Sequence, residues 1–228
     1  MRTILMAGVA LTAALIGPAA VADATADSAV RALLERPQVC GQADSADSGT
    51  PVADMVMVDG FGTGGFAIDA ASPEAQAWFN HGVRLRWAFE HKESVRAFRK
   101  ARLLDPSCAM CAWGEAWALG PNLNGGGNDD ESHAAALKAA REARRLARRA
   151  TPMQRQMIDA LVQRYSGLKS SRDRRFAQSM DRIARNNPGD VTVAAITADA
   201  WMLKAEKWWD DDGKAADPAI TRAMNILE

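Results

Sequence analysis

The cysteines are the residues of this chain whose type and spacing could do chemistry. Cys108 and Cys111 enclose the dipeptide Ala-Met, and Cys40 is the third cysteine of the sequence. Two thiols three positions apart occur in haem-attachment sites, redox centres, metal sites and local disulfides. Haem attachment requires a histidine directly after the second cysteine, and Ala112 stands there instead. A thioredoxin-like centre requires a strand before the helix, and no strand pattern precedes Cys108.

Two interpretations of these cysteines remain open. In one, His81 joins the three sulfur atoms of residues 108–111 as soft ligands of copper or zinc. In the other, the cysteines are structural: Cys108 and Cys111 form a disulfide, one of them pairs with Cys40, or the thiols are simply buried. Because residues 110 and 111 begin a helix whose apolar face packs inward, we favour the structural interpretation. We therefore expect no metal and no other cofactor.

The histidines and the acidic runs do not form a catalytic or metal centre of known geometry. His81, His91 and His133 never stand four residues apart on one helix, as in a zinc hydrolase. The acidic runs 128–131 and 210–213 lack the full spacing of a calcium loop, and helix capping with a turn explains them. No nucleophile stands beside a recognisable base, so we expect that the chain is not an enzyme.

A basic stretch from Lys138 to Arg175 is the strongest charged feature of the sequence. Such a stretch is usually a solvated helix face whose arginine stems cover alanine. The alternative is a docking strip for an acidic partner or an anionic lipid headgroup. The residues with a possible role in partner binding are Arg144, Arg145, Arg148 and Arg149. Basic and acidic residues number 28 each, so no net charge recruits nucleic acid or a membrane.

The N-terminus is typical of an exported protein. Met1-Arg2 is followed by an apolar run from Thr3 to Gly17, and both Ala20-Val21-Ala22 and Ala22-Asp23-Ala24 fit the small-x-small pattern of a cleavage site. The run is too short for a comfortable membrane span, and no later stretch is long enough for one. We therefore predict a signal peptide over residues 1–22 and a periplasmic or secreted mature protein. That protein would have no transmembrane segment and no nucleic-acid partner.

The rest of the chain divides near residue 71. We expect residues 23–71 to be a flexible segment with a short extended stretch between Val56 and Ile68, which several glycines interrupt. Residues 72–228 are predicted to be helical, because capping residues or prolines punctuate a sustained helical periodicity. The predicted helices cover residues 72–89, a stretch that follows a turn near His91 and carries Val95 to Leu104, and then residues 107–119, 132–149, 151–165, about 176–187, 190–208 and 217–228.

The first helix pair matches the tetratricopeptide (TPR) pattern, whose period is about 34 residues. Small residues at positions 82 and 94 allow the paired helices to approach closely, and large side chains at positions 78 and 98 fill the gap between neighbouring pairs. The repeat positions are Trp78, Gly82, Ser94, Phe98, Ala101 and Pro106. This pattern predicts an all-α, tetratricopeptide-like helix-pair solenoid of about three and a half to four pairs over residues 72–228.

Several runs resemble a family of exported bacterial tetratricopeptide repeat proteins over residues 60–228. They are residues 77–82, 104–110, 113–114, 118–122, Trp209 and residues 212–214. The resemblance implies a right-handed superhelix and a family of no settled activity. Its members are generally longer and continue with further helix pairs. The resemblance therefore implies that the repeat domain is incomplete at its C-terminus.

We expect the helical repeats to act as a binding scaffold. A solenoid presents a long surface, and a tryptophan left exposed on it would anchor a peptide. In the last helix, Ile220, Met224 and Leu227 share one side, which we expect to face the preceding helix. The predicted function is a periplasmic scaffold that binds a protein or peptide partner without catalysis. The alternative is a metal- or haem-handling periplasmic protein that uses Cys108 and Cys111.

Overall fold

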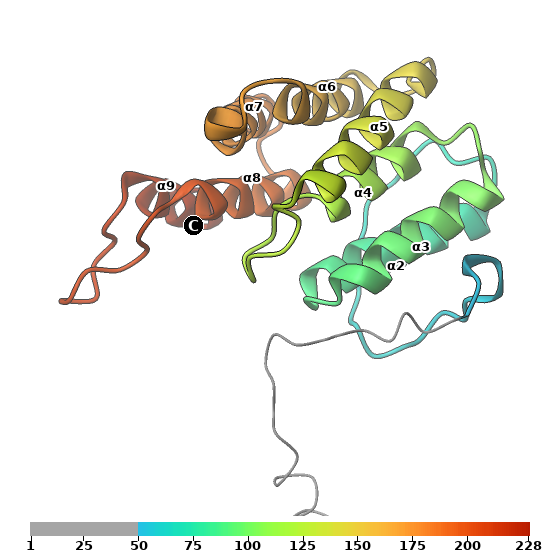
Figure 1. The fold of residues 1–228 in the computed structure, drawn as a ribbon, viewed down its shortest axis with the longest axis horizontal. Helices are drawn as coiled ribbons and strands as arrows, with labels where there is room; N and C mark the ends of the chain where they lie inside the picture. The colour runs from blue at the N-terminus through green and yellow to red at the C-terminus, as the bar shows by residue number, and fades with distance from the viewer. Residues whose placement is uncertain (1–49) are drawn as a thin grey trace, which may run out of the picture. The chain divides into compact units, whose positions relative to one another are not determined.

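The computed structural model describes residues 50–228, which form eight α-helices and no β-strand (Figure 1). The helices are α2 (Pro73–Trp87), α3 (His91–Leu104), α4 (Ala109–Leu119), α5 (Asp130–Leu146), α6 (Pro152–Ser166), α7 (Arg172–Asn186), α8 (Val191–Lys204) and α9 (Pro218–Leu227), with short 3-10 turns at Val52–Asp54 and Lys169–Ser171. The all-α prediction is confirmed for these residues. The predicted signal peptide, Cys40 and residues 23–49 lie outside the described part of the chain. No helix within that part is long and apolar enough to cross a membrane.

Capping residues in the sequence determine where the helices start. The Ser72 hydroxyl accepts a hydrogen bond from the Ala75 N–H at 3.1 Å, and Pro73 is the first residue of α2. Thr151 and Gln154 form a reciprocal capping box with distances of 3.2 and 3.0 Å. Aspartates cap α5, α8 and α9 in a similar way. Such caps satisfy N–H groups that have no partner inside the helix.

Each helix packs against the next one along the chain, and some alternate helices also touch. Helix α2 contacts α4, and α4 contacts α6, so these three helices lie in a row and share a face. Figure 1 shows α2 with α3, α4 with α5, and α8 with α9 lying alongside each other. Their facing sides form a hydrophobic core whose residues run from Trp78 to Ala200.

Phe98 lies at the centre of the first helix pair. Its fully buried ring lies between Gly82 of α2 and Gly114 of α4. A Cβ atom added at Gly82 would lie 2.9 Å from the ring, and one added at Gly114 would overlap it. The Ser94 hydroxyl donates a hydrogen bond to the Gly82 carbonyl at 2.8 Å. The helices therefore approach at Gly82 and Ser94, and Gly114 is a third close-contact position that the repeat pattern did not single out.

The other repeat positions lie around this contact. Trp78 and Ala101 are buried in the core. Pro106 is exposed and follows the end of α3 at Leu104. The residue before it, Asp105, is extended with φ −139° and ψ 90°. A proline disfavours helical geometry in the residue before it, which explains why α3 ends here.

Helix α8 is shorter than predicted, because it ends at Lys204 rather than at Trp208. The chain after it forms a turn around Asp210, whose carboxylate accepts hydrogen bonds from the N–H groups of Asp212 at 3.0 Å and Lys214 at 2.8 Å. The Trp208 indole donates to the Met202 carbonyl at 3.3 Å, which folds the turn back onto the helix end. The helix has already ended at Ala205, whose backbone is extended with φ −69° and ψ 133°, so the helical spacing of the tryptophans continues past the end of α8.

The predicted buried side of α9 was right for Ile220 and wrong for the other two residues. Ile220 is buried, whereas Met224 is 43% exposed and Leu227 is 62% exposed. The buried residues of α9 are Ala219, Ile220 and Ala223. Two alanines allow α9 to lie close to α8, with which it makes extensive contact. Ile220 and the two alanines therefore define the packed side of this helix.

Candidate functional site

A segment without regular secondary structure, Met55–Asp69, lies against the helices of the shared face; we name it the strap. Its Phe66 ring meets the rings of Phe79 and Trp113 edge-on, with centroid distances of 5.0 and 6.2 Å. No residue from 50 to 72 is buried, although several apolar strap residues pack partly against the core. The strap therefore lies on a core that the helices form among themselves. The extended stretch predicted between Val56 and Ile68 falls within it.

Two glutamine side chains hold the backbone of the strap. The Gln76 amide donates to the Phe66 carbonyl at 2.9 Å and accepts from the Ile68 N–H at 2.9 Å. The Gln154 amide donates to the Ala67 carbonyl at 3.1 Å. A side-chain amide that both donates to and accepts from an extended chain imitates the pairing of a β-strand. Sequence reasoning missed this arrangement, because nothing local to Gln76 or Gln154 shows which backbone they meet.

Charged groups hold the C-terminal end of the strap. Arg149 forms a two-pronged contact with the Asp69 carboxylate, with Nε–Oδ2 2.7 Å and Nη2–Oδ1 3.1 Å. The Ala71 N–H donates to the Asp105 carboxylate at 2.6 Å. Burial alone would raise the pKa of Asp105. Hydrogen bonds from Ser107 and Ala71 lower it by more than burial raises it, so this pKa lies below its ordinary value. The carboxylate of Asp105 thus stays charged and fixes the entry of the chain into α2.

A groove of about 760 Å³ lies between the strap and helix α8. Its walls are residues 76–87 of α2, residues 191–195 of α8 and residues 63–67 of the strap. Trp87 lines it and is 38% exposed, whereas Trp113 and Trp117 are fully buried. Trp87 is therefore the tryptophan that this groove offers to a ligand.

Buried charges join the two helices that form the groove walls. Arg86 of α2 lies 3.9 Å from Asp199 of α8, donates to the Pro121 carbonyl at 3.0 Å, and meets His91 Nδ1 at 3.0 Å. Burial lowers the pKa of Arg86 and raises that of Asp199, and each group partly opposes the shift of the other. Burial and the charge of Arg86 lower the pKa of His91 to about 4. His91 is therefore a neutral acceptor at neutral pH.

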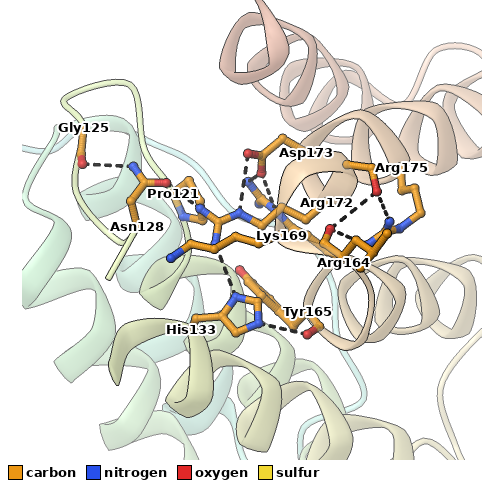
Figure 2. Close-up of polar contacts among 12 residues, drawn as sticks. Pro121, Gly125, Asn128, His133, Arg164, Tyr165, Lys169, Arg172, Asp173 and Arg175 are labelled. Carbon is orange, nitrogen blue, oxygen red and sulfur yellow. Dashed lines mark hydrogen bonds and ion pairs between the residues drawn. The ribbon is translucent and has the colours of Figure 1, made fainter. Parts of the chain in front are cut away.

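Figure 2 shows a second polar cluster, which connects α5, α6 and α7 with the loop before α5. The fully buried Arg164 donates to Asp173 at 3.0 and 2.5 Å. Arg172 donates to Asn128 at 2.5 Å and contacts His133 at 3.3 Å. The solvated-face interpretation of the basic stretch is therefore wrong for Arg164 and Arg172, because buried ion pairs and hydrogen bonds hold them inside the molecule.

The four arginines with a predicted role in partner binding are all exposed. Three of them have acidic partners: Arg144 pairs with Asp159, Arg145 with Glu142, and Arg149 with Asp69. Arg148 makes no ion pair or side-chain hydrogen bond with any residue of the described chain. The guanidinium group of Arg148, at the basic end of α5 next to the strap, thus has no ion-pair partner among the described residues.

The structure joins Cys108 and Cys111 by a disulfide. Both sulfur atoms lie in buried residues at the start of α4, where the Cys111 N–H also contacts Cys108 Sγ. Two sulfur atoms bonded to each other are not thiolates, and thiolates are what a soft metal site requires. His81 is buried in α2, and no group of three or more potential metal ligands occurs within residues 50–228.

Comparisons of the chain with protein-family models, with curated proteins and with solved structures gave no match. The strap, the groove and the charged clusters are the features of the described residues that bear on function.

Proposed function

We propose that this chain is an exported, tetratricopeptide-like repeat scaffold that binds an extended segment of a protein or peptide partner and has no catalysis of its own. The partner segment lies in the groove between the strap and α8. Trp87 is its apolar anchor. Rows of packed helix pairs support the repeat assignment, since α2, α4 and α6 lie side by side in the order that such an array requires.

The observation that carries this proposal is the strap itself. An extended stretch of polypeptide already lies on the α2–α4–α6 face, and its backbone is paired by the amides of Gln76 and Gln154. Peptide-binding surfaces commonly use backbone hydrogen bonds for affinity and pockets for specificity. A face that holds one extended chain in this way has the chemistry to hold a second one beside it.

The groove supports the proposal with an aromatic anchor. Aromatic side chains dominate binding energy at interfaces, and Trp87 lines the groove with 38% of its surface exposed, whereas Trp113 is buried. The side-chain amide of Asn80 also lines the groove and accepts a hydrogen bond from Gln76 at 2.9 Å. A partner would therefore meet one large apolar surface and polar side chains that can pair with its backbone.

Export fits the disulfide chemistry of the chain. Disulfides persist in oxidising compartments such as the periplasm, and Cys108 is paired with Cys111. The signal peptide predicted over residues 1–22 supports the same location. We place the scaffold in the periplasm or outside the cell.

Selection of peptides from a random display library by the purified full chain tests this function. We expect enrichment of peptides whose affinity falls about tenfold or more in a Trp87→Ala variant, since an aromatic anchor contributes on that order. Trp209→Ala is the matched control, because Trp209 is 47% exposed and lies outside the groove. Failure to enrich any peptide would refute the proposal, as would equal losses in the Trp87 and Trp209 variants.

A further inference from the structure

A separate cavity of about 330 Å³ lies between the start of α4 and the end of α5. Arg145, Arg148 and Arg149 line it, and the only acidic residue of its lining is Asp69 of the strap. Arg149 is paired with Asp69 and Arg145 with Glu142, which lies outside the lining, so Arg148 carries the one positive charge of the lining that no ion pair offsets. The cavity therefore attracts a negatively charged group.

The three arginines of the cavity differ in the ion pairs that they make. Arg149 is paired with Asp69 through both prongs of its guanidinium, and Arg145 is paired with Glu142 on its own helix. Arg148 has no partner among the described residues. The Asp69 carboxylate shows that the cavity accepts a carboxylate, and Arg148 leaves room for another one.

The opposite wall of the cavity adds to the same potential. Ala109 and Met110, the first two residues of α4, line it. The first turn of a helix has N–H groups without partners inside the helix, and these carry a partial positive charge. The Cys108–Cys111 disulfide spans this turn, so it holds the helix start in place.

We infer that this cavity is a second ligand site of the scaffold, specific for a carboxylate of an acidic peptide segment. The guanidinium of Arg148 binds the incoming carboxylate. Arg149 can bind a carboxylate of the ligand only in a variant that lacks the Asp69 carboxylate. The inference rests on the proposed function for the peptide nature of the ligand. It adds that the ligand is acidic and names the residues that bind it.

Titration calorimetry with the full chain tests the site, using hexa-aspartate as the probe and hexa-asparagine as its neutral counterpart. We expect binding of hexa-aspartate alone, weakened by added salt because exposed charges are screened. Arg148→Gln should weaken this binding about fivefold or more. Arg141→Gln, an exposed arginine of α5 that does not line the cavity, should leave it unchanged. Free succinate, tested separately, shows whether a carboxylate needs a peptide backbone to bind.

Removal of the resident carboxylate gives the sharper test. Asp69→Asn should tighten hexa-aspartate binding severalfold because it frees Arg149. Asp159→Asn removes an equal charge from Arg144, which does not line the cavity, and should not tighten binding.

Several outcomes overturn the inference. Equal losses in the Arg148 and Arg141 variants would show diffuse attraction rather than a site. The same holds for equal gains in the Asp69 and Asp159 variants. If hexa-aspartate does not bind while library peptides do, only the acidic site fails. If hexa-aspartate binds and no library peptide depends on Trp87, the groove proposal fails instead. Tighter binding of succinate than of hexa-aspartate would contradict a peptide ligand.

Discussion

Phe66 and Phe98 pack against the same ring, Phe79, with centroid distances of 5.0 and 5.5 Å, yet they belong to two very different regions. Phe98 is fully buried between two glycines of neighbouring helices. Phe66 is only half buried, and the backbone next to it is held by side-chain amides. The comparison teaches that the helices bury their core among themselves, whereas the strap packs on it from outside. We predict that the contacts of the strap can open while that core stays folded.

The largest effect should come from truncating the two phenylalanines. Phe98→Ala should lower the free energy of unfolding by roughly 3–5 kcal/mol, because it leaves a large cavity in the core. Phe66→Ala should cost clearly less, about 1–2 kcal/mol, since its ring is already partly hydrated. Urea denaturation followed by circular dichroism measures both. Equal losses would show that the strap belongs to the core.

The second effect contrasts a buried ion pair with an exposed one. Asp173→Asn leaves the fully buried Arg164 without its counter-charge and should cost about 3 kcal/mol. Asp159→Asn breaks the pair with Arg144, in which both side chains are about half exposed, and should cost less than about 1 kcal/mol. Thermal denaturation at low salt compares the two variants. A small loss for Asp173→Asn would mean that solvent reaches Arg164.

The third effect is a pH dependence that comes from His91. Its pKa in the folded protein is about 4, against 6.5 for the ordinary value. Between these values the unfolded chain binds a proton that the folded protein does not. Stability should therefore be complete above pH 6.5, fall by roughly 1–3 kcal/mol as the pH drops to 4, and level off below. A His91→Gln variant should lose this slope in urea denaturation at pH 7, 6, 5 and 4. An imidazole that titrates near pH 6.5 by NMR would contradict the account.

The smallest effect on stability should come from the exposed end of the strap. Asp69→Asn removes the pair with Arg149, whose side chains are 43% and 64% exposed, and should change the free energy of unfolding by less than about 1 kcal/mol. The strap amides should nonetheless exchange faster with solvent, because one of the strap's attachments is gone. Denaturation and hydrogen exchange on the same variant separate the two readouts. A stability loss above about 2 kcal/mol would make this end of the strap structural.

Much of the helical fold could be predicted because its determinants are local. Ser72, Thr151 and Asp217 mark helix starts by capping chemistry that acts within three residues. The close approach at Gly82 and Ser94 also followed from spacing along the sequence. The end of α8 and the packed side of α9 could not be read in this way. The helical spacing of the tryptophans continues past the residue at which α8 ends, and the packed side of α9 depends on how Ala219, Ile220 and Ala223 fit against α8.

The site could be predicted only in part, because its contacts join distant parts of the chain. Gln154 meets Ala67 across 87 positions, and Arg149 meets Asp69 across 80. Residue type alone marked the arginines near the end of α5 for binding, but it could not separate the unpaired Arg148 from the buried Arg164. Burial is a property of the fold, and the sequence shows only the positive charge that both share.

Native-state hydrogen exchange at the Ile68 amide tests the central claim most directly, since this N–H bonds to Gln76 on the strap side of the face. We predict that Ile68 exchanges through a local opening whose free energy lies roughly 2 kcal/mol or more below that of core amides in α4, because local opening of a weakly held segment precedes global unfolding. Equal opening free energies for Ile68 and the α4 amides would contradict the claim, because the strap would then unfold only together with the helices.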